Sequence, residues 1–191
     1  MSEVLPLPVI LARRVMTGVS VKELQGIAVS WIESGHDFPA LHELAWDPVL
    51  SWRDADFLFD AVASTVGLSL PSRAEASEIL VYYHIRRIAQ GHCTPEGGLA
   101  GIMRDAYWPE LSKKTSLVYV GDADGLEHFI GAYWGYDDLR DSPDVVGYDG
   151  LYGEEAVQAF DMHVRNLAAE WLLQHPAPND LACLDGKPFA D

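Results

Sequence analysis

Histidines offer the widest range of chemistry in this sequence, because imidazole can ligate a metal or transfer a proton near neutral pH. No HExxH or HxH motif occurs, so local spacing predicts no metal site. His84 falls on the apolar stripe from Leu80 to Ile88, and we interpret it as a packed, hydrogen-bonded core residue rather than a catalytic one. The chain contains seven histidines: His36, His42, His84, His92, His128, His163 and His175.

Two carboxylate–histidine pairs lie close together in the sequence: Glu127 with His128, and Asp161 with His163. Either pair would form an acid–base dyad if the helices that carry them met. An enzymatic interpretation therefore assembles its site from His128, His163, Asp161 and Glu155. We keep it as an alternative, because no local motif fixes a chemistry.

The two cysteines, Cys93 and Cys183, belong to no CxxC pair, so a zinc knuckle is not indicated. We favour a reduced pair over a disulfide between them. His92 directly precedes Cys93, but adjacent side chains seldom orient toward one another. We therefore interpret this dipeptide as the turn before a helix rather than a nucleophilic site.

Two glycine-containing segments resemble ligand-binding loops but lack residues that the corresponding motifs require. Residues 121–127, GDADGLE, share acids with a calcium loop, yet Ile130 and Gly131 stand where an EF-hand needs its final glutamate. Glycines 97, 98 and 101 do not form GxGxxG, and we interpret them as permitting close helix packing. The sequence thus predicts no catalytic residue, metal or cofactor.

The chain has 191 residues and a net charge of −16, which is unusually acidic for an ordinary globular composition. Such a charge argues against binding nucleic acid or anionic membranes, because each phosphate contact needs a cation. The apolar run Val4–Ala12 is short and precedes Arg13 and Arg14, whereas a signal peptide places its charges first. We therefore predict a cytoplasmic protein.

Apolar residues recur at helical intervals through most of the chain. Helix-capping residues Ser20, Ser51, Ser72 and Thr94 stand ahead of four of these stretches. We predict an all-α fold: one domain of about seven helices over residues 1–175, an irregular tail over 176–191, and at most a minor strand near 117–120. The predicted helices cover residues 8–16, 20–35, 51–67, 72–90, 94–106, 126–136 and 154–174, and a short helical piece covers residues 39–45.

Two short segments match at a constant offset of 73 residues: RRVMTG over 13–18 and RRIAQG over 86–91. Each reads as a helix that ends in a basic pair and a glycine, followed by a turn and a capped helix. The match indicates a candidate duplicated helical hairpin, although the same local logic would also produce it by convergence.

Acidity is concentrated in residues 122–161, where eleven acids and one base, Arg140, give a net charge of −10. Unpaired charges at this density repel one another. If this surface had only a structural role, a few lysines would relieve the repulsion. Aromatic residues alternate with the acids, which suits an interface that binds a cationic partner. A solvated acidic face that maintains solubility is the alternative. The predicted partner-binding residues are Asp122, Asp124, Tyr133, Trp134, Tyr136, Asp137, Asp138, Asp141, Asp144, Tyr148 and Tyr152.

In its size, acidity and tryptophan content the chain resembles bacterial immunity proteins, which bind and block a cognate toxin. The resemblance covers the whole chain in character and includes no shared motif. It implies a non-enzymatic inhibitor, monomeric or homodimeric, whose acidic and aromatic surface occludes a basic toxin. A dimeric scaffold or regulatory subunit that uses exposed tryptophans is a further alternative.

Overall fold

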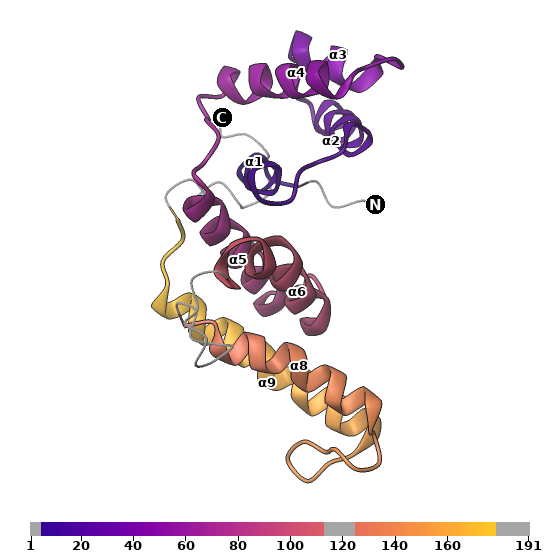
Figure 1. Ribbon diagram of the computed structural model, residues 1–191, viewed down its shortest axis with the longest axis vertical. Helices are drawn as coiled ribbons and strands as arrows, with labels where there is room; N and C mark the ends of the chain where they lie inside the picture. Colours follow the sequence, from indigo (N-terminus) through magenta and orange to yellow (C-terminus); the bar gives the residue numbers. More distant parts are fainter. Residues whose placement is uncertain (1–4, 113–124, 179–191) are drawn as a thin grey trace. The chain divides into compact units, whose positions relative to one another are not determined.

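The computed structural model describes residues 5–112 and 125–178 (Figure 1). These residues form eight α-helices and one π-helical segment, and no sheet occurs among them. The predicted all-α fold is confirmed. The strand that we predicted near residues 117–120 lies outside the described residues.

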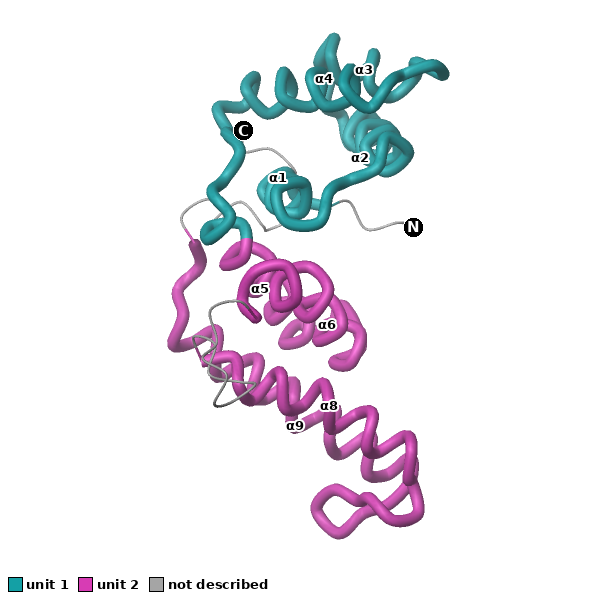
Figure 2. Tube along the Cα trace, viewed as in Figure 1, with its two compact units in different colours: residues 1–76, 179–191 teal, residues 77–178 magenta. Residues whose placement is uncertain are grey.

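The chain divides into two compact units, with the boundary between Ala76 and Ser77 (Figure 2). The second unit extends from Ser77 to Pro178. A single domain over residues 1–175 stays a prediction, and so does the irregular tail, since most of residues 176–191 lie outside the described part.

The first unit contains helices α1 (Leu7–Met16), α2 (Val21–Glu33), α3 (Pro39–Trp46) and α4 (Trp52–Thr65). Its core is apolar and includes Trp31, which stacks on Phe59 at a ring-centroid distance of 6.0 Å. Arg14 of α1 pairs with Asp56 and Asp60 of α4, at 2.6 Å and 2.5 Å respectively. These ion pairs join the first and last helices of the unit.

The predicted helix starts are confirmed by their capping hydrogen bonds. Ser20 forms a capping box with Glu23, and the Oγ atom of Ser51 accepts a hydrogen bond from the amide of Asp54. Ser72 and Thr94 cap α5 and α6 in the same way. Side-chain oxygens thus satisfy amides that would otherwise lack a partner in the first helical turn.

The second unit contains most of α5 (Arg73–Ala89), together with α6 (Pro95–Ile102), α8 (Glu127–Asp141) and α9 (Gly153–Gln174). A Cβ atom at Gly98 would lie 2.3 Å from Ile88 Cγ1, and one at Gly101 would lie 2.4 Å from His84 Cε1. The predicted role of these glycines in close helix packing is therefore confirmed. Helices α8 and α9 lie side by side as a hairpin (Figure 1).

A π-helical segment, η1 (Met103–Leu111), continues α6 beyond the predicted helix end near Ala106. Pro109 lies inside this segment. In an α-helix its ring would clash with the carbonyl group four residues earlier. A wider turn relieves that clash, which is why the helical path continues past the expected stop.

The two segments of the candidate repeat adopt the same local structure. Gly18 and Gly91 have positive φ angles of 81° and 70° and follow the ends of α1 and α5. Each glycine leads into a capped helix, α2 or α6. The predicted helix–glycine–helix geometry is confirmed for both copies, and a common origin for them stays a prediction.

Candidate functional site

The solvent-exposed face of α8 carries a tryptophan followed by three aspartates. Trp134 is 43% exposed, and Asp137, Asp138 and Asp141 are all exposed. These positions are separated by three, four and seven residues from Trp134, so they share one face of the helix. The sequence periodicity thus places an aromatic anchor beside three negative charges.

The loop between α8 and α9 continues this surface. Asp149 and Gly150 have positive φ angles of 53° and 77°, and they form the turn between Tyr148 and Leu151, whose backbones exchange two hydrogen bonds. The amide of Gly153 donates to the carbonyl of Pro143 at 3.1 Å, which closes the loop. Residues 143–152 therefore connect the two helices through successive turns.

We define the acidic tip as the exposed residues at this end of the hairpin. Within it, Val145 is 80% exposed and Tyr152 is 57% exposed. The acidic tip therefore exposes apolar area and negative charge on the same surface. The acidic tip consists of Trp134, Asp137, Asp138, Asp141, Asp144, Val145, Asp149, Leu151, Tyr152, Glu154 and Glu155.

Two of the aromatic residues that we predicted to contact a partner instead support the acidic tip from within. Tyr136 is 2% exposed, and its hydroxyl donates to Asp161 Oδ1 at 2.5 Å. Burial and the adjacent carboxylate both raise the pKa of Tyr136, so the hydroxyl stays a donor. Tyr148 is partly buried against Phe160 and His163.

The other predicted partner-binding residues differ in where the structure places them. Tyr133 is partly buried, with its ring edge-to-face against Trp134 at 5.2 Å. Asp144 is exposed in the loop. Asp122 and Asp124 lie outside the described residues. Among the described members of the predicted set, the exposed large aromatic residues are therefore Trp134 and Tyr152.

The one base of the acidic segment is already paired with an acid outside it. Arg140 forms an ion pair with Glu96 at the start of α6. Within the described residues, no ion pair is formed by the seven exposed acids of the tip. No ion pair within the described part of the chain therefore neutralises their negative charges.

The acids and histidines of the enzymatic alternative do not form a common site in the described structure. His128 lies beside Glu127 at the start of α8, with 4.0 Å between their nearest polar atoms. Asp161 accepts from Tyr136, whereas His163 stacks on Phe160 at 6.0 Å. Glu155 is exposed on the acidic tip.

A buried acid–base cluster that the sequence analysis missed surrounds His84. The Nε2 atom of His84 lies 2.9 Å from Asp105 Oδ2, and the guanidinium of Arg104 donates to both oxygens of Asp105. Burial alone would raise the pKa of Asp105, but the hydrogen bonds from Arg104 and His84 outweigh it and hold that pKa well below its usual range. The prediction of a hydrogen-bonded core histidine is confirmed.

The sequence contains one indication that Asp105 is buried: this acid stands between the apolar residues Met103 and Ala106. Its partner His84 is 21 residues away, beyond the reach of local periodicity. The His84 ring lies against Gly101 and beside the ring of Tyr83, with 5.3 Å between the ring centroids. The hydrogen bond between His84 and Asp105 thus joins α5 to η1 within the core.

The remaining candidate groups are the potential metal ligands and the two cysteines. In the described ranges, no three His, Cys, Asp or Glu side chains are arranged to hold a metal ion. Cys93 is partly buried beside Gly98, and Cys183 lies outside the described residues, so a disulfide between them stays untested. Across residues 5–112 and 125–178, no helix is both long and apolar enough to span a membrane.

Comparison with known proteins gives no relative from which to transfer a function. No family model matches the chain, and no curated protein or solved structure is significantly similar to it.

Proposed function

We propose that this protein is a non-enzymatic binding protein whose acidic tip occludes a basic protein partner, as an immunity protein occludes its toxin. The observation that carries the proposal is the combination of exposed aromatic residues with seven exposed acids that form no ion pair within residues 5–112 and 125–178. Aromatic side chains supply contact area at an interface, and complementary charge guides the encounter.

The position of the acids on α8 supports a role in binding rather than in folding. Asp137, Asp138 and Asp141 occupy the last turns of the helix, which ends at Asp141. Negative charge there faces the negative end of the helix dipole and costs about 0.3 to 1 kcal/mol per residue. A surface selected for solubility alone has no need to place three acids at that end.

The direct test is charge reversal at these positions. We expect the Asp137→Lys, Asp138→Lys, Asp141→Lys variant to lose capture of the basic partner while its thermal stability rises, because lysine suits a helix C-terminus. The measurement is affinity capture of proteins from the native host on the immobilised chain, followed by binding kinetics with each purified captured protein.

A matched control carries the same change in net charge away from the acidic tip. Glu33, Glu43 and Glu170 are exposed and lie outside it, so their reversal to lysine should leave capture intact. Equal capture by the tip variant and the wild type at low salt would overturn the proposal. Growth protection on co-expression with the captured protein would identify that protein as a toxin.

A scaffold or regulatory subunit is the second candidate function, favoured by an apolar turn in the first unit. Trp46, Val49 and Trp52, around the turn from α3 to α4, are 63%, 86% and 65% exposed. Exposed apolar groups at this density often mark an interface. A dimer in sedimentation velocity that dissociates in the Trp46→Ser, Trp52→Ser variant would favour this function over the lead proposal.

A further inference from the structure

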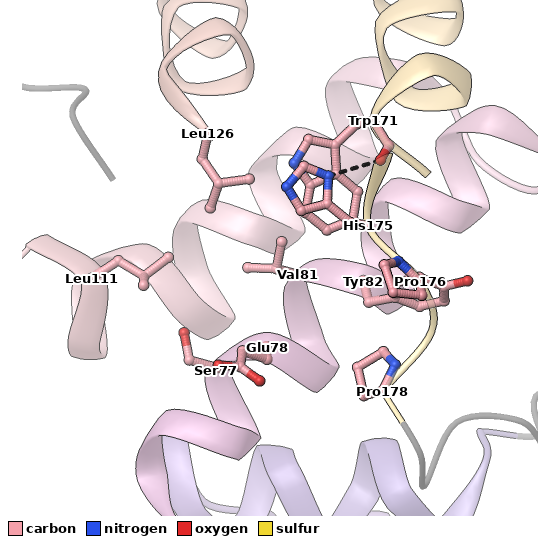
Figure 3. A pocket seen from close by; sticks show the side chains of 10 residues that line it. All are labelled: Ser77, Glu78, Val81, Tyr82, Leu111, Leu126, Trp171, His175, Pro176 and Pro178. Carbon is pink, nitrogen blue, oxygen red and sulfur yellow. Dashed lines mark hydrogen bonds between the residues drawn. The ribbon is translucent and has the colours of Figure 1, made fainter. Parts of the chain in front are cut away.

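A cavity of about 430 Å³ lies within the second unit, away from the acidic tip. Pockets of about 300 to 1,000 Å³ are typical of small-molecule sites. Figure 3 shows Ser77 and Glu78 on one side of the cavity and the rings of Trp171 and His175 on the other, with Val81, Leu111 and Leu126 between them.

Two polar groups in the cavity wall are buried, and neither has a hydrogen-bond partner in the described part of the chain. They are the Oγ atom of Ser77, a residue that is 1% exposed, and the indole Nε1 of Trp171. A buried donor without an acceptor is costly, and native proteins seldom keep one without a reason. Because both groups belong to residues that line the same cavity, a ligand there could satisfy them together.

The imidazole of His175 adds an acceptor next to the indole donor. Its ring stacks on Trp171 at 4.0 Å, and its Nδ1 lies 2.8 Å from the Trp171 carbonyl. A carbonyl can only accept, so Nδ1 carries the hydrogen, and Nε2 of the neutral ring is an acceptor. A Cβ atom at Gly125 would lie 3.9 Å from this Nε2 and 4.0 Å from the indole Nε1, so both nitrogens lie beside Gly125.

We propose that this cavity binds a neutral, planar small molecule with an amide-type edge. The amide carbonyl accepts from Trp171 Nε1, the amide N–H donates to His175 Nε2, and the apolar body lies against Val81, Leu111 and Leu126. A hydroxyl at the far end of the ligand reaches Ser77. The carboxylate of Glu78 and the net charge of −16 disfavour an anionic ligand.

The test uses 6-hydroxy-2-naphthamide as the probe, with 2-naphthamide and the anion 6-hydroxy-2-naphthoate as matched comparisons. We expect saturable binding of both amides, a downfield shift of the Trp171 indole proton in ¹H–¹⁵N spectra, and no binding of the anion. The Trp171→Phe variant assigns that resonance and should weaken both amides about 3- to 10-fold, because one neutral hydrogen bond is lost.

Two further variants test the two ends of the cavity independently. Ser77→Ala should weaken only the hydroxylated amide, by about 3-fold or more, and His175→Phe should weaken both amides while keeping the stacked ring. Trp134→Phe, on the acidic tip, should change neither affinity. Circular dichroism and thermal melting establish that each variant is folded.

The proposal is overturned if neither amide binds saturably, as expected for a cavity that another part of the chain already fills. It is also overturned if both amides bind equally well to the wild type and to the folded Trp171→Phe and Ser77→Ala variants. Either result leaves the acidic-tip proposal intact, because none of these substitutions touches the tip.

Discussion

At the level of single residues, Asp105 carries the clearest energetic prediction. It is 1% exposed and holds its charge only because Arg104 and His84 hydrogen-bond to it. Replacing it with asparagine removes the buried negative charge that the hydrogen bonds from Arg104 and His84 stabilise. We expect Asp105→Asn to lower the free energy of unfolding by roughly 3 kcal/mol at pH 7, measured by urea denaturation.

The pH dependence of that loss follows from the lowered pKa of Asp105. A carboxylate with a depressed folded-state pKa stabilises the protein above its unfolded pKa of about 3.9. This contribution disappears as the pH falls from there through the folded pKa. The difference between wild type and Asp105→Asn should therefore be constant near neutrality and shrink below about pH 4.

Asp137→Asn is the matched control, because Asp137 is exposed and makes no ion pair in the described part of the chain. Removal of this charge should raise the free energy of unfolding by at most about 1 kcal/mol, because Asp137 lies near the C-terminus of α8. A similar loss of stability in both variants would contradict the assignment of Asp105 as a buried structural anion.

At the level of helices, the contact between α5 and α6 depends on the absence of side chains at Gly98 and Gly101. A Cβ atom at either position would approach Ile88 or His84 to less than any normal contact. We expect Gly101→Ala to destabilise the protein by about 1 to 3 kcal/mol through overpacking, as measured by thermal and urea denaturation.

Gly131 of α8 provides the opposite case, since a Cβ atom there would meet nothing within 4 Å. Gly131→Ala should stabilise the protein by about 0.5 to 1 kcal/mol, because alanine has the higher helix propensity. If Gly101→Ala were equally stabilising, the close approach of α5 and α6 would be incorrect.

At the level of the whole molecule, the net charge of −16 should govern how fast a cationic partner is captured. The screening length falls from about 30 Å at 0.01 M salt to about 10 Å at 0.1 M. We expect the association rate to drop at least about tenfold over this range, with a much smaller change in the dissociation rate. Stopped-flow fluorescence measures both rates.

Substitution in the exposed apolar turn between α3 and α4 distinguishes the two candidate functions. Trp52→Ser leaves the acidic tip unchanged, so it should alter neither the association rate nor its salt dependence. A loss of binding in Trp52→Ser equal to that in the charge-reversal variant would show that the partner contacts the first unit as well.

The sequence by itself predicted the all-α class, the start of each capped helix and the packing role of the α6 glycines. These features depend on local interactions: apolar residues recur within one helical turn, and a capping side chain such as Ser20 bonds an amide three residues away. The concentration of acids in residues 122–161 was likewise visible from counting alone.

Tertiary structure decided which of those residues face solvent and which are internal. It buried Tyr136 against Asp161, 25 residues away, and paired Arg140 with Glu96 across 44 residues. It also joined His84 to Asp105 and placed Ser77 and Trp171 in the wall of one cavity. Local periodicity carries no information on such distant contacts, because they depend on how the helices pack against one another.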